Sequence, residues 1–300
     1  MSDEPGSMFT IVDGAFAPRM PAAPTTAVVV SVPHAGVATH GFEATLSPEL
    51  DVRCDADLYV DRLYRIGAPD GPEVSLAARL SRFVCDLNRD ADDVSPGAVP
   101  EHPAPRNADG RGFIWAVTTA GVPAIARPLT LDEWRARTAL HATYHDTLAQ
   151  ALARARARFG FAILVDGHSM PSRGRAGHKD PGRARAEVVP GDREGTSCAP
   201  ALSRLVGAHF AKRGYSVAFN DPYKGGYITT HHGRPVDDIH AIQIELRRDL
   251  YMNETTYDLV EPGFSKLSET LTDLLRDLRN FRPADLSKSP SPRPAGRGVG

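Results

Sequence analysis

The sequence has 300 residues, 41% of them hydrophobic, and a formal net charge of -2 at pH 7. This length allows one large α/β domain or two small ones, while the near-neutral charge excludes the strongly basic surface that binding to nucleic acid or to an anionic membrane requires. We therefore expect a small-molecule substrate and no nucleic-acid or membrane partner.

The cysteines and the first residues indicate the compartment. Cys54, Cys85 and Cys198 are odd in number and show no Cys-x-x-Cys spacing, which suits a reducing environment better than a disulfide framework. The first residues lack the basic start and apolar core of a signal peptide, and no apolar run reaches membrane-spanning length. We predict a cytoplasmic protein, and the sequence leaves its oligomeric state open.

The two ends of the chain differ in composition from the part between them. Residues 1–20 are mixed in character and contain Pro and Ala, and residues 282–300 are polar and rich in Pro, Gly and Ser. Such segments bury too little apolar surface to pack. We expect a flexible N-terminal segment over 1–20, one catalytic domain over 21–281 and a disordered tail over 282–300.

Between these ends, short aliphatic runs alternate with helical patterns along the chain. This alternation is typical of an α/β fold in which helices cover a mainly parallel sheet. Most of the strands should be buried on both faces, because their apolar residues are continuous rather than alternating. The predicted strands are Ala27 to Val32, Glu73 to Ala77, Arg82 to Leu87, Phe161 to Val165, Ser216 to Phe219 and Ala241 to Leu246.

Two helices and one long loop are predicted between and after these strands. Thr130 and Glu133 form a capping-box pattern at the start of a helix over Leu131 to Phe159, which a glycine ends. A last helix around Ser265 to Leu278 carries leucines on one face. The stretch Asp90 to Arg111 is rich in Pro, Gly and Asp, which predicts a surface loop near the site.

Polar residues lie at the ends of four of the predicted strands or directly after them. In an open α/β sheet, ligands bind at the carboxyl ends of the strands, and these residues are therefore the first candidates for chemistry. We expect them to lie close together at one edge of the sheet. They are His34, His168, Glu245 and the group Asp86, Asn88 and Arg89.

The histidines and nearby aspartates predict a metal site. Two histidines and one carboxylate around an ion, with a fourth position left to water, form a common catalytic zinc site, because the ion lowers the pKa of water toward ~7. His34 and His168 would be the imidazole ligands, with Asp57 as the first choice for the carboxylate and Asp55 as the second. Glu245 is then free to take a proton from the attacking water and pass it to the leaving nitrogen. An arginine near the metal would stabilise the oxyanion.

These residues belong to motifs that resemble the N-formylglutamate amidohydrolase family, whose distant relatives are the zinc carboxypeptidases and aspartoacylase. The similarity extends over roughly Val28 to Glu254. The matching motifs are Ser31-Val32-Pro33-His34-Ala35-Gly36, Asp55-Ala56-Asp57, Ser81 to Arg89, Asp166 to Ser172, Gly191 to Cys198, and Asn220 to Thr229 with its continuation through His231, Gly233 to Pro235 and His240 to Glu245.

The resemblance implies hydrolysis of N-formyl-L-glutamate to formate and L-glutamate, the last step of one bacterial route of histidine degradation. It also implies a three-layer α/β fold like that of the zinc carboxypeptidases and the phosphorylase/hydrolase-like proteins, with a mainly parallel mixed sheet and helices on both faces. One divalent ion, zinc first and cobalt, manganese or iron as alternatives, would be held by His34, Asp57 and His168. Water activated by the ion would attack the amide, and Glu245 matches the catalytic glutamate of the family.

The resemblance further implies which residues contact the substrate. Asn88 and Arg89 look like the pair that grips a substrate carboxylate in carboxypeptidase and aspartoacylase. Arg82 is placed like the oxyanion arginine of aspartoacylase, although its spacing to that pair is one residue shorter. Glutamate carries two carboxylates, and a second cationic group is therefore needed. The candidates left open for it are Lys224, Arg234 and Arg248.

Other functions fit parts of the same pattern. A related metal-dependent hydrolase of another N-acyl amino acid, or a catalytically inactive binding homologue, would share the fold. An arginase-like formiminoglutamate hydrolase would need an aspartate at the position of Met170, two residues after His168, and it ranks low for that reason. The long basic segment Arg173 to Arg185, and His232 where a tyrosine is common, depart from the family pattern and allow a shift in substrate preference.

A second pair of histidines lies on the long predicted helix. His141 and His145 are four residues apart, a spacing that can bind a metal. They lie on the apolar stripe of the helix, however, and we interpret them as packing or hydrogen-bonding residues.

Overall fold

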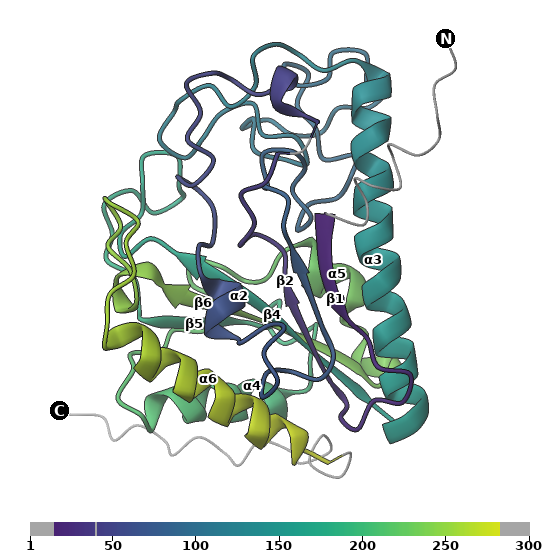
Figure 1. Cartoon of the computed structure of the whole chain (residues 1–300), viewed down its shortest axis with the longest axis vertical. Helices are drawn as coiled ribbons and strands as arrows, with labels where there is room; N and C mark the ends of the chain where they lie inside the picture. The colour runs from purple at the N-terminus through teal and green to yellow at the C-terminus, as the bar shows by residue number, and fades with distance from the viewer. Residues whose placement is uncertain (1–14, 40, 283–300) are drawn as a thin grey trace, which may run out of the picture.

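The computed structural model describes residues 15–39 and 41–282 and shows a six-stranded sheet in the order β1-β3-β2-β4-β6-β5 (Figure 1). Strands β3, β2, β4 and β6 are parallel, and the edge strands β1 and β5 run antiparallel to their neighbours. The predicted α/β class with a mainly parallel mixed sheet is confirmed. The strands are β1 (Phe16–Arg19), β2 (Val28–Val32), β3 (Ser75–Ala78), β4 (Ala162–Met170), β5 (Val188–Gly191) and β6 (Ile239–Arg247).

Four of the predicted strands are confirmed to within a few residues, and two predicted strands are wrong. Arg82 to Leu87 forms consecutive turns, because its backbone amides bond within the turns and to Phe113 rather than to a neighbouring strand. Ser216 to Phe219 contributes an isolated bridge between Val217 and Val188 instead of a strand. The sequence patterns do not predict β1 or β5, since each has four residues and β5 contains a proline.

The N-terminal edge of the domain lies earlier than the composition predicts. Phe16–Arg19 falls in the segment expected to be flexible, yet it pairs with Ser75–Ala78 along its whole length. This pairing satisfies backbone groups at the edge of the sheet, which composition alone does not reveal. The rest of that segment, residues 1–14, and the predicted disordered tail, residues 283–300, lie outside the described residues.

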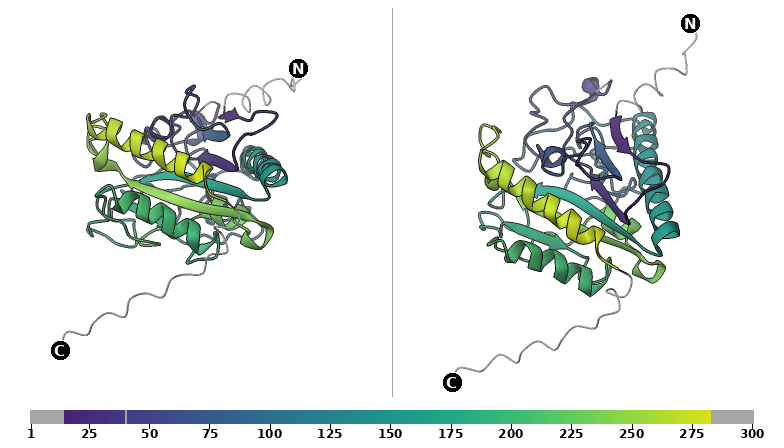
Figure 2. Two further views of the ribbon diagram at one scale, coloured as in Figure 1. Left: turned by 90° about the horizontal axis from the view of Figure 1, so that it is seen from below. Right: turned by 60° about the horizontal axis from the view of Figure 1, so that its bottom comes forward.

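Helices pack on both faces of the sheet, as predicted. The buried valines of β2 alternate between two apolar clusters, with Val28, Val30 and Val32 in one and Val29 in the other. Because successive side chains of a strand point to opposite faces, the two clusters lie on opposite sides of the sheet. Figure 2 shows α6 packed along the sheet. The first cluster contains residues of α2 (Val60–Leu63), α4 (Pro200–Ala211) and α6 (Gly263–Arg279), and the second contains residues of α3 (Leu131–Phe159) and α5 (Tyr227–His232).

Helix α3 has the ends that the sequence predicts. Thr130 Oγ1 accepts a hydrogen bond from the Glu133 N–H, and the Glu133 carboxylate accepts one from the Thr130 N–H. Gly160 ends the helix with a φ of 82°, a conformation that glycine adopts without strain. The helix runs past the sheet to the loops beyond it (Figure 1), where Trp134 Nε1 donates to Ala91 O at 3.0 Å. Helix α3 therefore holds the predicted long loop against the domain.

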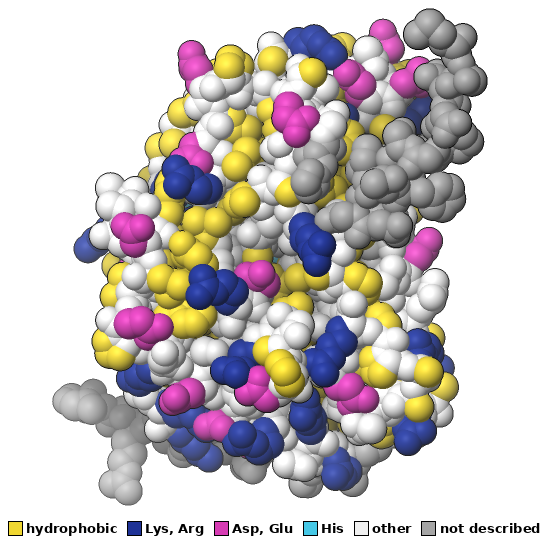
Figure 3. Space-filling model, in the orientation of Figure 1, with side chains coloured by type: hydrophobic (Ala, Val, Ile, Leu, Met, Phe, Trp, Pro, Cys, Tyr) yellow, Lys and Arg dark blue, Asp and Glu magenta, His cyan; other side chains and the backbone are white. Residues whose placement is uncertain are grey.

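The surface carries charges of both signs. Figure 3 shows acidic and basic side chains interspersed over one face, in agreement with the formal net charge of -2. Among the described residues, no helix is long and apolar enough to cross a membrane. Three short 3-10 helices complete the described elements, namely η1 (Glu43–Thr45), η2 (Pro235–Asp237) and η3 (Arg248–Leu250).

Candidate metal centre and active-site cavity

A cavity of about 650 Å³ opens where β2, β4 and β6 end. His34 follows β2, while His168 and Glu245 lie near the ends of β4 and β6. Parallel strands bring their carboxyl ends to one edge of a sheet, which is why residues distant in sequence meet here. The predicted site residues that line the cavity are His34, Asp57, Arg82, Asn88, Arg89, His168, Lys224, Glu245 and Arg248.

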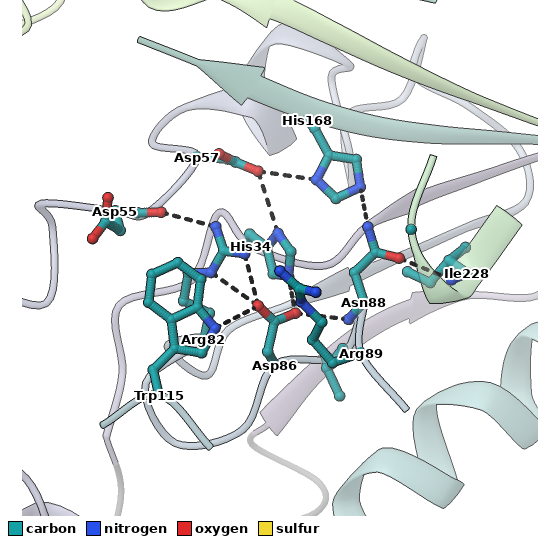
Figure 4. A network of polar contacts seen from close by, with 12 residues as sticks. His34, Asp55, Asp57, Arg82, Asp86, Asn88, Arg89, Trp115, His168 and Ile228 are labelled. Carbon is teal, nitrogen blue, oxygen red and sulfur yellow. Dashed lines mark hydrogen bonds and ion pairs between the residues drawn. The ribbon is translucent and has the colours of Figure 1, made fainter. Parts of the chain in front are cut away.

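His34, Asp57 and His168 form a cluster of three buried ligand atoms within 4.8 Å of one another (Figure 4). Asp57 Oδ2 is 3.1 Å from His168 Nδ1 and 3.5 Å from His34 Nδ1. His34 Nδ1 is buried and has no hydrogen-bond partner among the described residues, an arrangement that is costly unless another group satisfies the nitrogen. A divalent ion between the three atoms would satisfy it, and the residues therefore fit the predicted metal.

The other nitrogen of each histidine is held by an aspartate. His34 Nε2 lies 2.7 Å from Asp86 Oδ1, and His168 Nε2 lies 2.9 Å from Asp166 Oδ2. When each Nε2–H donates to its carboxylate, both Nδ1 atoms are left unprotonated and face Asp57. Histidines that bind metals are commonly oriented in this way, and the ring orientation here thus supports the predicted ligand set.

Burial and charge together set the ionisation of two of these aspartates. Burial alone would raise the pKa of Asp57, but hydrogen bonds with His168 and His34 hold that pKa well below its ordinary value. Burial of Asp86 is likewise outweighed, chiefly by the guanidinium of Arg82, which keeps the pKa of Asp86 well below its ordinary value. Both carboxylates are therefore anionic at neutral pH, as binding of a cation requires.

Asp166 is a buried residue that the strand pattern does not single out, although its spacing of two from His168 places both side chains on one face of β4. It also accepts a hydrogen bond from Ser31 Oγ at 3.0 Å. We expect Asp166→Ala to weaken zinc binding by ~10–100-fold, because the His168 ring loses the acceptor that orients it. Competition with a chromophoric chelator measures this affinity, and Asp166→Asn, which keeps an acceptor oxygen, is the milder matched variant. An unchanged affinity in Asp166→Ala would contradict the assigned role.

Asp55, the second choice for the carboxylate ligand, faces a different set of partners. It accepts hydrogen bonds from the Thr119 N–H at 2.9 Å and from Thr119 Oγ1 at 2.5 Å. Arg175 Nη1 adds a third contact, at 3.0 Å from Asp55 Oδ1. Asp55 lines the cavity but does not belong to the three-residue cluster. The geometry therefore favours Asp57 over Asp55 as the ligand.

Glu245 lies beside the cluster on β6, in register with His168 of β4. Its side chain is buried, and burial raises the pKa of Glu245 to about 7, in the range suited to general acid/base catalysis. Gln243 Nε2 donates to Glu245 Oε1 at 2.9 Å, and Gln243 Oε1 accepts from the Gly226 N–H at 3.1 Å. Gln243 was not among the predicted site residues. Its spacing of two from Glu245 is the sequence signal that could have revealed it.

Arg82, which the family resemblance suggests as the oxyanion arginine, lies in the wall of the cavity. Its Nη2 donates to Asp86 Oδ2 at 2.7 Å, and its guanidinium carbon lies 4.4 Å from the centroid of the Trp115 ring. Trp115 Nε1 donates to the same oxygen of Asp86 at 3.0 Å. Asp86 thus orients both Arg82 and His34, which links the candidate oxyanion group to a candidate ligand.

Asn88 and Arg89 also line the cavity, next to the cluster. Asn88 Oδ1 accepts from the Ile228 N–H at 2.8 Å, and Asn88 Nδ2 lies 3.3 Å from His168 Nε2. The side chain of Arg89 is 43% exposed, and its Nη1 is 3.7 Å from Asp93 Oδ2. Asn88 is therefore fixed, whereas Arg89 is held loosely at the mouth of the cavity.

Two of the three candidate cations for the second carboxylate line the cavity, and each already has an acidic partner. Arg248 Nη2 lies 3.1 Å from Asp57 Oδ1, and Arg248 Nε donates to Ser169 Oγ at 3.1 Å. Lys224 Nζ lies 2.6 Å from Glu194 Oε1 and is half exposed. The position of Arg248 suits support of Asp57 better than direct contact with a substrate.

Arg234, the third candidate, is not among the residues that line the cavity. Its Nε lies 3.0 Å from Asp237 Oδ2 on the half-exposed surface. Arg234 is the N-cap residue of η2, and Asp237, three residues later, is the last residue of that short helix. The position of Arg234 does not support the predicted role in substrate binding.

His141 and His145 hydrogen-bond internally, as interpreted from the sequence. His141 Nε2 lies 2.9 Å from Arg89 O, and His145 Nε2 lies 3.0 Å from Leu87 O. His145 Nδ1 is 3.0 Å from His232 Nε2. Burial lowers the pKa of His145 to about 2, and the ring is therefore neutral. These histidines support the backbone on either side of Asn88.

The chain is similar to known sequences over most of its length. Residues 26–252 match the family described as N-formylglutamate amidohydrolase. An N-formylglutamate deformylase from Pseudomonas aeruginosa is 34% identical over 261 residues, which cover 83% of this chain and 92% of that protein. A protein of the same name from Pseudomonas putida is 35% identical over 260 residues, with the same coverage of both chains.

Solved structures show the same relationship. An N-formylglutamate amidohydrolase from Ralstonia eutropha JMP134 aligns with a TM-score of 0.80 and 33% identity, covering 89% of this chain and 98% of its own. The gene product Atu2144 from Agrobacterium tumefaciens aligns with a TM-score of 0.61 and 22% identity over 90% of this chain and 98% of its own. The similarity to the Agrobacterium protein shows a shared fold alone.

Proposed function

The chain belongs to the N-formylglutamate amidohydrolase family, and we propose that it hydrolyses N-formyl-L-glutamate to formate and L-glutamate. The Pseudomonas relatives named N-formylglutamate deformylase support this substrate. The structural observation that carries the proposal is the buried cluster of His34, Asp57 and His168 with Glu245 in the wall of the same cavity. A metal-dependent hydrolysis of an amide needs this combination of groups.

We propose that His34, His168 and Asp57 would hold one divalent ion. Zinc is the first choice, because two imidazoles and one carboxylate are a frequent catalytic zinc set, and cobalt, manganese or iron are alternatives that such ligands also accept. When bound, the ion would polarise the formyl oxygen and acidify the attacking water. The buried, unpartnered His34 Nδ1 supports this assignment.

Glu245 moves the protons in the proposed reaction. Its carboxylate takes a proton from the water that attacks the formyl carbon, and it delivers the proton to the amide nitrogen as the C–N bond breaks. Formate and the amine of glutamate then leave. Gln243, which donates to Glu245 Oε1, keeps the carboxylate in place. Arg82 stabilises the negative charge that develops on the formyl oxygen.

Asn88 and Arg89 bind the carboxylate of the substrate that lies nearer to the reacting amide. The supporting observation is that Asn88 Nδ2 lies 3.3 Å from the ring of His168, next to the proposed metal. We also propose that the protein is cytoplasmic and that it acts in histidine degradation. The location has its support in Cys54, Cys85 and Cys198, which are all free thiols.

Formate release by the purified, zinc-loaded protein tests the proposed substrate. N-formyl-L-glutamate, N-acetyl-L-glutamate and N-formyl-L-leucine separate the acyl group from the amino acid. We expect kcat/KM for N-formyl-L-glutamate to exceed that for either other compound by ~10²-fold or more, since a site built around carboxylates rejects analogues that lack them. Preference for N-acetyl-L-glutamate, or no turnover of N-formyl-L-glutamate, would refute the proposal.

A further inference from the structure

The second carboxylate of the proposed substrate needs a cationic partner, and the inference in this section rests on the proposed function. The cations in the cavity wall differ in whether they already have an acidic partner. Among the described residues, four of them lie within 3.2 Å of a carboxylate oxygen, which neutralises much of their charge. These are Arg82, Arg111, Lys224 and Arg248.

Three other cations of the wall remain. Arg89 is loosely paired with Asp93 and sits beside Asn88, where it serves the nearer carboxylate. Lys179 and Arg193 also line the cavity, and neither forms an ion pair with a carboxylate among the described residues. Lys179 is exposed, and its charge is therefore screened by water. Arg193 is partly buried, and a carboxylate that binds there meets an uncompensated guanidinium.

The backbone around Arg193 is held by a glycine turn, formed by Gly225 and Gly226, that precedes α5. The Arg193 N–H donates to Lys224 O at 2.7 Å, and Arg193 Nη1 donates to Gly225 O at 3.2 Å. Arg193 itself has a φ of 54°, and Gly225 a φ of 107°, both in the left-handed region that is rare for residues with a side chain. A Cβ on Gly225 would lie 3.2 Å from Arg193 Cδ. The guanidinium is therefore anchored through one nitrogen, while its other two nitrogens have no hydrogen-bond partner among residues 15–39 and 41–282 and can meet a carboxylate.

The position of Arg193 relative to the metal centre indicates which carboxylate it meets. Asn88 Nδ2 lies 3.3 Å from His168 Nε2, and a Cβ on Gly226 would meet the Asn88 side chain. Gly225 precedes Gly226 and carries the contact to Arg193. The wall thus runs from the candidate ligand His168 through Asn88 and the glycine turn to Arg193. Along this chain of contacts, counted from the candidate ligand His168, Arg193 comes after Asn88.

We propose that Arg193 binds the side-chain carboxylate of N-formyl-L-glutamate and thereby selects glutamate over neutral amino acids. Arginine matches the planar carboxylate with two parallel N–H···O bonds, which a lysine cannot form. The substrate's α-carboxylate is left to Asn88 and Arg89. This assignment replaces Lys224, Arg234 and Arg248, which are paired elsewhere or lie outside the cavity.

The test compares acid and amide substrates in wild type and Arg193→Met, a variant that keeps the aliphatic stem. We expect kcat/KM for N-formyl-L-glutamate to fall by ~10²-fold, the value of a lost charged hydrogen-bond pair. For N-formyl-L-glutamine, whose side chain ends in a neutral amide, kcat/KM should change by less than about threefold, within the scatter of such contacts. Arg193→Lys keeps the positive charge but lacks the planar guanidinium. Its kcat/KM should fall by about tenfold for N-formyl-L-glutamate and not for N-formyl-L-glutamine.

Controls separate this inference from folding and from the proposed function. Tm and bound zinc per chain are compared for every variant. If Arg193→Met does not fold, the comparison of acid and amide substrates is made with Arg193→Lys instead. Equal losses on acid and amide substrates, or the same selective loss in Lys179→Met, would overturn the assignment of Arg193. A selective loss seen instead with the α-amide, N-formyl-L-isoglutamine, would also overturn it. If wild type releases no formate from N-formyl-L-glutamate, the proposed function itself fails.

Discussion

Replacing Glu245 by glutamine is expected to lower kcat for formate release by ~10²–10⁴-fold, the usual contribution of a general acid/base. Glutamine has nearly the same shape but cannot accept a proton at neutral pH. The hydrogen bond from Gln243 Nε2 to Oε1 of residue 245 can persist in the variant, and the local geometry should be retained. The loss should therefore appear in kcat, with the metal still bound.

Steady-state kinetics and bound zinc per chain measure this effect together. Glu187→Gln is a matched control, because Glu187 does not line the cavity. Glu187 lies just before β5, and its carboxylate accepts a hydrogen bond from the Ser216 N–H. The control variant should retain wild-type kcat. A loss of less than about threefold in Glu245→Gln, far below the contribution expected of a general base, would remove Glu245 from the proton transfers. Loss of zinc from that variant would show that Glu245 acts as a ligand instead.

Asp57→Asn is expected to abolish stoichiometric metal binding and to reduce activity by ~10³-fold or more, since the ion contributes several kcal/mol to the transition state. Asp57 Oδ2 faces both histidine Nδ1 atoms, and a neutral amide there provides a weaker ligand. Asp55→Asn, two residues away, should keep the metal because Asp55 bonds to Thr119 and Arg175 rather than to the cluster.

Metal content of the two aspartate variants is measured after dialysis against a fixed free zinc concentration. Asp57→Asn leaves Arg248 without its carboxylate partner, and an uncompensated buried charge can destabilise the fold. His168→Ala is therefore examined in parallel, because it removes a ligand without touching that pair. If Asp57→Asn and His168→Ala both bind one zinc per chain while Asp55→Asn does not, the predicted ligand set is wrong.

The buried strands and the polar residues at their ends could be predicted from the sequence. β2 and the first half of β4 are mostly aliphatic runs, a pattern typical of a strand covered on both faces, and β6 carries Ile242, Ile244 and Leu246 at every second position. His34, His168 and Glu245 stand at or near their ends, and parallel strands necessarily bring such residues to one edge. The capping box of α3 was predictable for a similar reason, since Thr130 and Glu133 act locally.

This pattern does not single out the residues that support the site. Asp166 and Gln243 become relevant only because their strands place them beside His168 and Glu245. Arg82 to Leu87 has the apolar content of a strand, but its amides bond within turns. The sequence also shows how many arginines are present without showing which are already paired. Because ion pairs are not visible in the sequence, Arg234, which is paired in the structure, was a candidate for binding the second carboxylate, and Arg193 was not.

Titration of metal into stripped protein tests the central claim most directly. The chain is freed of metal with a chelator, zinc is added in fractions of an equivalent, and formate release from N-formyl-L-glutamate is measured at each step. A single ion held by His34, Asp57 and His168 predicts no activity at the start, a linear rise, and saturation at one equivalent per chain. Full activity without added metal, or a rise that continues to two equivalents, would contradict the account.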